Sequence, residues 1–260
     1  MDMKKPLIIT ALYDIGRSDW KDFSMSYDTY LVWMENTLAL NCEMVIFIQP
    51  KFEERVRLMR SKIDPDNILT KYVINEIEDL EAYKIWNNSL TTLMESDNFK
   101  DRRHWDHVPE MNHPLYNIVM FNKVFFLKEA LNLCPYATHL LWLDAGGIRH
   151  GIDKNIWPDV NKLESNTVTK FSHNVPFEIT NPEWHSFSQL RHIQGTAFIC
   201  PSIMIDWYIK EIHKTIDGCI SMGFIGSDEK IFDLTYIKDP SKFTLIKQDW
   251  REYYNWLKIN

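Results

Sequence analysis

Short apolar runs alternate with amphipathic stretches along the first part of this 260-residue chain, and this alternation restricts the fold more than any other feature. The runs lie at 7–13, 44–48 and 68–74, and stretches with helical spacing follow at 27–40, 52–59 and 76–94. Strands that alternate with crossover helices pair in parallel, so we expect an α/β fold with a mostly parallel sheet flanked by helices. Ligands of such sheets bind beyond the carboxyl ends of the strands.

The same rules predict the later elements. They are a helix over 115–133, a buried strand over 139–143, a strand over 195–200, and helices over 202–216 and 227–237. The inward stripe of the long helix should be Leu115, Ile118, Val119, Asn122, Phe125, Phe126, Glu129 and Leu133. Residues 97–114 are expected to form an irregular loop, and 154–192 short strands or loops. Because no repeat or linker interrupts the chain, we expect one compact domain over 1–260.

Charge and composition exclude some classes of protein. The formal net charge of -7 argues against a general nucleic-acid binder, which needs a broad basic face. Aromatic residues make up 13% of the chain, which fits a filled core and also a sugar-binding cleft. The four cysteines form no CxxC pair, so free thiols in a reducing compartment are expected. The first apolar run is too short for a signal peptide or a membrane span. These features predict a cytoplasmic protein and leave open whether a partner holds it at a membrane.

Asp144 is the most specific local feature. It ends the apolar run 139–143 and is followed by Ala145, Gly146 and Gly147. A carboxylate in this position is costly without a partner, and the glycines let a ligand approach the backbone closely. Two interpretations remain open. Asp144 binds Mg²⁺ or Mn²⁺ beside a diphosphate, or its side chain caps the following turn.

Four segments, in this order, resemble the HtrL/YibB-type glycosyltransferase family. They are Ile9–Arg17, His113–Tyr116 with Asn122–Lys123, Trp142–Gly146, and the pair Asp228–Glu229. The resemblance implies a GT-A-like fold with a nucleotide-binding half over 1–150 and an acceptor-binding half over 151–260. It also implies transfer of a sugar from a nucleotide diphosphate donor, a UDP-sugar, to a glycan or lipid-linked acceptor, assisted by Mn²⁺ or Mg²⁺.

The family's metal motif is Asp-x-Asp, and Gly146 stands here in place of the second acid. Asp144 is therefore left as the expected metal ligand, with phosphate oxygens and water in the other positions. By resemblance, Tyr13 would stack on the base. The nucleotide-binding residues that the resemblance implies are Thr10, Ala11, Leu12, Tyr13, Arg17, Lys123, Asp144, Ala145 and Gly146.

Two cations and an acidic pair carry the expected chemistry. The Arg17 guanidinium and the Lys123 ammonium would contact the diphosphate, although a solvated loop and an exposed helix face would also suit them. Asp228 and Glu229 begin a helix that Ser227 can cap. One of the two acids, with Asp228 favoured, would deprotonate the acceptor hydroxyl as general base.

Further substrate contacts are expected around residue 190. They are Gln194, Gly195 and Thr196 at a strand start, and Trp184 and His185 before it. A grouping of His104, His107, His113, Asp101 and Asp106 lacks the helical His-Glu-x-x-His pattern and is expected to be a loop.

Two other functions remain open. A sugar-phosphate nucleotidyltransferase would share the fold and the metal, although Gly16 alone is a poor substitute for its glycine-rich loop. A non-catalytic nucleotide- or sugar-binding module would account for the missing second acid.

Overall fold

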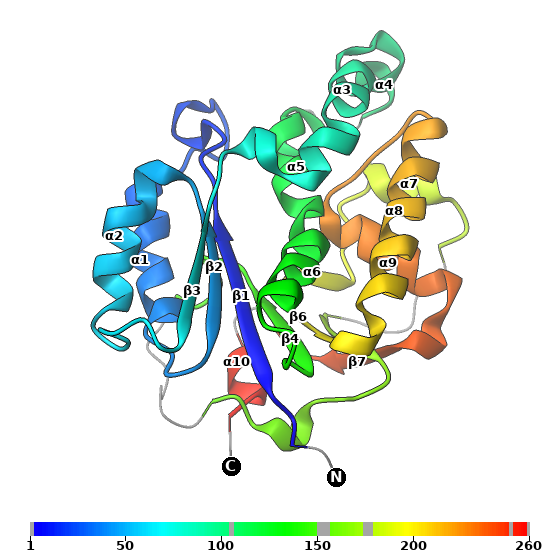
Figure 1. Ribbon diagram of the computed structural model, residues 1–260. Coiled ribbons are helices and arrows are strands. Elements are labelled where there is room, and N and C mark those ends of the chain that lie inside the picture. The colour runs from blue at the N-terminus through cyan, green and yellow to red at the C-terminus, as the bar shows by residue number, and fades with distance from the viewer. Residues whose placement is uncertain (1–2, 104–106, 150–156, 174–178, 250–251, 259–260) are drawn as a thin grey trace.

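One seven-stranded sheet organises the part of the chain that the computed structural model describes, residues 3–103, 107–149, 157–173, 179–249 and 252–258 (Figure 1). The strand order is β3-β2-β1-β4-β6-β5-β7. The strands are β1 (Pro6–Leu12), β2 (Met44–Ile48), β3 (Thr70–Ile74), β4 (His139–Leu143), β5 (Val168–Ser172), β6 (Ile193–Pro201) and β7 (Phe243–Lys247). The expected α/β fold, with a mostly parallel sheet in a single domain, is confirmed.

Strand β6 runs against the rest of the sheet. It pairs antiparallel with β4 and with β5, whereas the other four pairings are parallel. Leu143 at the end of β4 is in register with Ala197 in the middle of β6, so Ile193–Thr196 extend beyond the end of β4. The first residues of β6 therefore lie at the same edge of the sheet as the carboxyl ends of β1 and β4.

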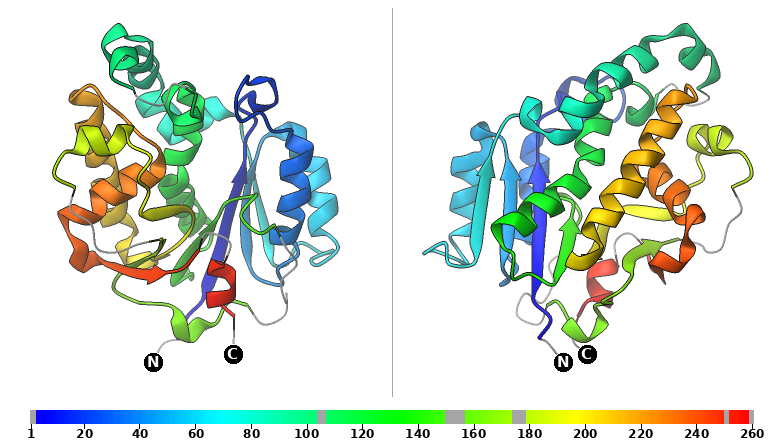
Figure 2. Two further views of the ribbon diagram at one scale, coloured as in Figure 1. Left: turned by 180° about the vertical axis from the view of Figure 1, so that it is seen from behind. Right: turned by 45° about the vertical axis from the view of Figure 1, so that its right-hand side comes forward.

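Helices cover both faces of the sheet (Figures 1 and 2). One face packs on α1 (Tyr27–Leu38) and α2 (Glu53–Arg60). The other face packs on α3 (Glu81–Glu95), α5 (Pro114–Phe121), α6 (Lys123–Leu133), α8 (Ile205–Ser221) and α9 (Asp228–Lys238). Successive strand residues point to opposite faces, so Ile8 joins the first core and Ile9 the second. No helix in the described ranges has both the length and the apolar character needed to cross a membrane.

The predicted long helix is interrupted at Asn122, which separates α5 from α6. Asn122 is buried, and its Oδ1 accepts a hydrogen bond of 3.0 Å from the amide of Ala82 at the start of α3. Because of this break, the buried face of α6 differs by about one position from the predicted inward stripe. Its buried residues are Lys123, Val124, Phe126, Leu127 and Ala130. Glu129 and Leu133 are exposed, so their predicted place in the inward stripe was wrong.

Some elements differ from the expected boundaries. The segment predicted as a loop contains α4 (Asp97–Arg102), because the Ser96 hydroxyl accepts from the amide of Phe99 and the Phe99 ring is fully buried. Strand β5 lies in the segment expected to form short strands or loops, whereas β7 had no predicted counterpart. Two short helices, α7 (Pro182–Phe187) and α10 (Tyr253–Trp256), complete the described part of the chain.

Candidate active site

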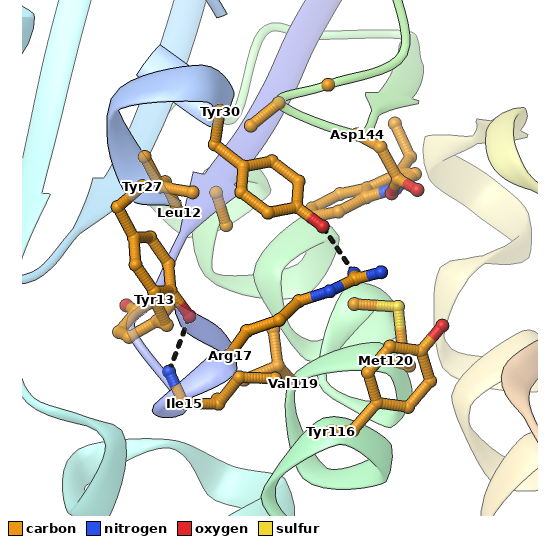
Figure 3. A pocket seen from close by; sticks show the side chains of 14 residues that line it. Leu12, Tyr13, Ile15, Arg17, Tyr27, Tyr30, Tyr116, Val119, Met120 and Asp144 are labelled. Carbon is orange, nitrogen blue, oxygen red and sulfur yellow. Dashed lines mark hydrogen bonds between the residues drawn. The ribbon is translucent and has the colours of Figure 1, made fainter. Parts of the chain in front are cut away.

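Two adjoining clefts open at the carboxyl edge of β1 and β4. The first is lined mainly by apolar and aromatic groups and encloses about 670 Å³ including its open mouth (Figure 3). Its lining residues are Ala11, Leu12, Tyr13, Ile15, Arg17, Tyr27, Tyr30, Tyr116, Val119, Met120, Trp142, Asp144, Ala145 and Gly146. Seven of the nine nucleotide-binding residues expected from the sequence thus come together here, and Lys123 lies in the neighbouring cleft.

Two tyrosines from the first turn of α1 form one wall of this cleft. The Tyr27 hydroxyl accepts a hydrogen bond of 2.7 Å from the amide of Ile15 and so fixes the loop after β1. The Tyr30 hydroxyl accepts a hydrogen bond from the Arg17 guanidinium. Gly16, with φ of 74°, provides the left-handed turn before Arg17. Arg17 consequently extends across the cleft between α1 and α5 (Figure 3).

The second cleft is polar and shares Tyr116, Met120 and Asp144 with the first. Its remaining lining residues are Lys123, Arg149, His173, Arg191, Gly195, Thr196, Ser227, Asp228, Glu229 and Asp249. These side chains come from α6, β6, α9 and the segments that follow β4, β5 and β7. The cleft therefore joins groups from both predicted halves of the chain.

Lys123 lies at the centre of the polar cleft, with only 1% of its side chain exposed. Its Nζ is 2.9 Å from Asp144 Oδ1 and 2.7 Å from Asp228 Oδ2, and it donates a third contact of 2.9 Å to the carbonyl of Gly195. Burial alone would lower the pKa of Lys123, but the two carboxylates raise it above its ordinary value. The lysine is therefore a fixed ammonium ion, and its alternative place on an exposed helix face is excluded.

Asp144 keeps one side toward the ligand space. Its Oδ1 accepts a hydrogen bond of 2.7 Å from the indole nitrogen of Trp142 in addition to the contact with Lys123. About 30% of the side chain remains exposed. Burial raises the pKa of Asp144 and Asp228 adds to this effect, against the lowering influence of Lys123. The carboxylate faces both clefts at the point where they meet.

Gly195 allows β6 to approach the acidic pair. A Cβ at this position would lie 3.0 Å from Cγ of Asp228 and still nearer to its Oδ2. No side chain fits there unless Asp228 moves. The glycine therefore sets the distance between its own carbonyl, Lys123 and Asp228.

Glu229 and Asp228 have different environments although they are adjacent. Asp228 is 5% exposed and bound to Lys123, whereas Glu229 is 19% exposed and lies 3.3 Å from Arg191 Nε. Arg191 also binds Glu110 at 2.8 Å. Burial raises the pKa of Glu229 to about 7. The neighbouring Asp228 carboxylate adds to this increase, and the Arg191 guanidinium reduces it. Glu229 can therefore exchange a proton near neutral pH.

Four of the expected site residues lie elsewhere. Thr10 is fully buried inside β1, and its hydroxyl has no hydrogen-bond partner within the described ranges. Gln194 is buried and donates to the carbonyl of Gln248. Trp184 is exposed on α7, and His185 is buried beside it, and neither lines the two clefts. Tyr13 does line the first cleft, but its ring already stacks on Phe126.

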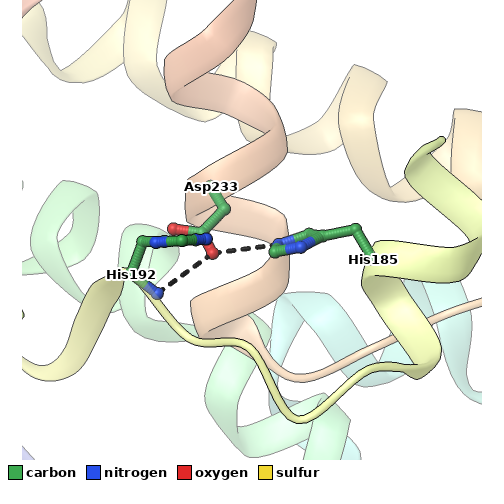
Figure 4. A group of neighbouring side chains, drawn as sticks. All are labelled: His185, His192 and Asp233. Atoms are coloured by element: carbon green, nitrogen blue, oxygen red, sulfur yellow. Dashed lines mark hydrogen bonds and ion pairs between the residues drawn. The ribbon is translucent and has the colours of Figure 1, made fainter. Parts of the chain in front are cut away.

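His185 belongs to a separate group with Asp233 and His192 (Figure 4). One ligand atom from each side chain lies within 4.8 Å of the others, a spacing that could hold a metal ion. Asp233 is fully buried and accepts from His185 Nε2 at 3.0 Å, from the amide of His192 at 3.3 Å and from the amide of Ile193 at 2.9 Å. The bonds from His192 and Ile193 attach the start of β6 to α9, and the bond from His185 attaches α7 to α9.

The histidines of the earlier candidate grouping are only partly described. His104 and Asp106 lie outside the described residues. The ring of His113 stacks on Trp20 with 3.8 Å between ring centres, and that of His107 stacks on Phe23 at 6.1 Å. Both described histidines thus contact the loop that follows β1.

Several lining residues had no predicted role. They are Tyr27, Tyr30, Tyr116, Met120, Trp142, Arg149, His173, Arg191 and Asp249. Tyr27 and Tyr30 were correctly placed on a helix but assigned to its apolar stripe. Their position directly after the loop that ends β1 was the available signal, because residues at that edge face the ligand space.

Comparison with known proteins gives a family and distant structural likenesses. Protein HtrL of Escherichia coli (strain K12) is 26% identical over 267 residues, which cover 92% of this chain and 86% of that protein. A glycosyltransferase involved in the glycosylation of the major capsid of PBCV-1 is 10% identical with a TM-score of 0.40, over 94% of this chain and 81% of that chain. The 4-diphosphocytidyl-2C-methyl-D-erythritol synthase from Anaerococcus prevotii has the same identity of 10% and TM-score of 0.40, over 98% and 90%.

Structural likenesses at this level carry no argument about the reaction. The family model described as "Bacterial protein of unknown function (HtrL_YibB)" matches residues 4–258, nearly the whole chain. The chain therefore belongs to the HtrL_YibB family.

Proposed function

We propose that the protein transfers a sugar from a nucleotide diphosphate donor, a UDP-sugar, to a hydroxyl of a glycan or lipid-linked acceptor. One observation carries the proposal. An aromatic cleft and a polar cleft meet at Asp144, and both lie at the carboxyl edge of the sheet. The first suits a nucleoside and the second a diphosphate with the sugars. The predicted nucleotide-binding half, 1–150, supplies every lining residue of the first cleft.

The nucleoside fits the aromatic cleft by chemistry. The rings of Tyr27 and Tyr30 offer flat apolar surface to a base, and this role replaces the one expected of Tyr13. Arg17 crosses the cleft toward the side where Asp144 lies (Figure 3), and a guanidinium there can bind the oxygens of a diphosphate in a bidentate manner.

Lys123 supplies the fixed positive charge for the leaving diphosphate. As the bond between the sugar C1 and the phosphate oxygen breaks, the leaving group keeps the electron pair and its negative charge grows. The N–H donors of Lys123 are taken by Asp144, Asp228 and Gly195, so the buried ammonium acts on this charge through its field, without having to reorganise. Asp144 and Asp228 hold Lys123 in position through the contacts at 2.9 and 2.7 Å.

Glu229 suits the role of general base better than Asp228. In an inverting transfer the base takes the proton of the acceptor hydroxyl while its oxygen forms the bond to C1. Asp228 is only 5% exposed, and its Oδ2 already binds the Lys123 ammonium. Glu229 is more exposed, lines the polar cleft and has a pKa of about 7, close to the value that favours proton transfer at neutral pH.

We infer that the residues around Asp144 do not fit the expected Mg²⁺ or Mn²⁺. One oxygen of Asp144 is already taken by Trp142 and Lys123. A divalent ion on the other oxygen would stand about 5 Å from the ammonium nitrogen, given metal–oxygen distances near 2.1 Å. At an effective dielectric constant of about 20 the two cations would repel by about 7 kcal/mol, which weakens the attraction of such an ion to the carboxylates of Asp144 and Asp228. No step of the proposed reaction uses a metal.

Ligand binding and product analysis test the proposal. UDP at about 100 times its dissociation constant should stabilise the protein by about 2.7 kcal/mol, a rise in Tm of about 5–10 °C. Asp144→Ala should reduce that rise. With a UDP-sugar and an acceptor hydroxyl the protein should release UDP, whereas a nucleotidyltransferase would release pyrophosphate from a nucleoside triphosphate and a sugar phosphate. If no nucleotide stabilises the protein, and Asp144→Ala behaves as the wild type, the proposal is wrong.

A further inference from the structure

We propose that this site binds its nucleotide diphosphate without a divalent metal, because the Lys123 ammonium occupies the place between two carboxylates that a metal ion would take. The inference rests on the proposed function and deepens it. The cation of the site is then the Lys123 ammonium, in place of the metal ion that the resemblance implied.

The contacts of Lys123 are those of a bound cation. Three oxygens surround its Nζ, from Asp144, Asp228 and the carbonyl of Gly195, at 2.7 to 2.9 Å. Carboxylate and carbonyl oxygens are also the ligands that hard divalent ions prefer. An ammonium has three N–H donors, and three acceptors are present. The three N–H donors of Lys123 therefore match the three oxygens around them.

The surroundings prevent Lys123 from leaving this place. The side chain is 1% exposed, and its Nζ lies 5.6 Å from the centre of the Trp142 ring. Trp142 is itself held, because its indole nitrogen donates to Asp144 and its ring stacks on Phe126 at 5.7 Å. A metal ion could take the place between the two carboxylates only by displacing a buried ammonium.

The replaced acid of the metal motif agrees with this arrangement. Gly146 stands where the metal motif has its second carboxylate, and a Cβ there would lie 3.0 Å from the Trp33 ring. The carboxylates of Asp144 and Asp228 carry two negative charges and share one positive charge. Loss of that single charge would leave a pair of acids suited to a divalent ion.

The test is UDP binding to the whole protein by calorimetry, in EDTA and in Mn²⁺. The wild type should bind UDP with dissociation constants that differ by less than about twofold between the two conditions. Lys123→Met should bind at least about tenfold more weakly in EDTA, and Mn²⁺ should restore part of the affinity. Lys128→Met is the matched control, because Lys128 lies on the same helix in an exposed pair with Asp206 and should change neither value.

The outcomes separate the two proposals. Wild-type binding that requires Mn²⁺ overturns the metal-free site but leaves the sugar-transfer proposal standing. Absence of UDP binding in both conditions overturns the sugar-transfer proposal and this inference with it. If Lys123→Met does not fold, the wild-type comparison still decides. Electron paramagnetic resonance of Mn²⁺ in the presence of UDP and protein then gives an independent reading, since binding of the ion at the site would broaden its signal.

Discussion

Replacement of Gly195 by alanine tests the packing of the polar cleft most directly. The new Cβ would lie 3.0 Å from Cγ of Asp228 and closer to its Oδ2. Asp228 cannot simply rotate away, because its carboxylate is 5% exposed and bound to Lys123 at 2.7 Å. The methyl group must therefore either push β6 from α9 or break the ion pair.

Both responses are expensive. Overpacking of a filled site costs about 1–3 kcal/mol, and a buried charge that loses its partner costs about 3–5 kcal/mol. Because the partner is displaced rather than removed, we expect the free energy of unfolding to fall by about 3 kcal/mol. For a chain of this size that corresponds to a fall in Tm of about 6–12 °C. UDP binding should weaken as well, since the Lys123 ammonium moves with Asp228.

Gly218→Ala is the matched control. Gly218 lies inside α8, and nothing stands within 4 Å of a Cβ built on it. The same substitution there should raise the free energy of unfolding by up to about 1 kcal/mol, because alanine favours the helix over glycine. Urea denaturation of the three proteins measures both effects. If Gly195→Ala unfolds within about 0.5 kcal/mol of the wild type, the proposed fit between β6 and α9 is refuted.

Three further predictions concern single titratable groups. The rate of transfer should rise with pH and level off above about pH 7, because the Glu229 pKa is about 7 and the base must be ionised. Glu229→Gln should abolish this pH dependence. Arg191→Leu should move it to higher pH, because Arg191 lowers the pKa of Glu229. Lys170 on β5 is fully buried with no hydrogen-bond partner among the described residues, so Lys170→Met should raise the free energy of unfolding by about 1–3 kcal/mol in chemical denaturation. Burial holds the pKa of Lys170 well below its usual value, so the wild type binds more protons when unfolded; its stability should increase with pH toward the alkaline range, and this component should be missing in Lys170→Met. Asp233→Asn replaces a carboxylate that accepts three hydrogen bonds by an amide, and it should lower Tm. EDTA should leave the Tm of the wild type unchanged. A fall of Tm in EDTA would show that His185, Asp233 and His192 hold a metal ion.

Local sequence patterns were sufficient for the elements that position Asp144. The run HLLWL is apolar after its first residue and is followed by small residues, so both β4 and its loop could be predicted. Strands β5 and β7 could not, because VTKFS and FTLIK mix polar with apolar residues. In β5 the lysine is buried between the rings of Phe198 and Phe232, a contact that no local pattern contains.

The residues of the site divide in the same way. The position of Asp144 follows from the end of one strand, whereas that of Lys123 depends on Asp228, 105 residues further along the chain. A lysine on a helix is ordinarily exposed, so only the tertiary structure reveals that this one points inward. The assignment of the base role likewise depended on Arg191 and Glu110, since those groups distinguish Glu229 from its neighbour.

The reversed direction of β6 also has a consequence for how the protein acquires its site during synthesis. A nascent chain that ends before residue 190 already contains Lys123 and Asp144, but it lacks the carbonyl of Gly195 and the carboxylate of Asp228. Contacts over such separations form late, because long loops must close first. Strands β1 and β4 can pair early. Lys123 lacks its contacts with Gly195 and Asp228 until β6 pairs with β4. Competence to bind the donor should therefore appear only when the last third of the chain has folded.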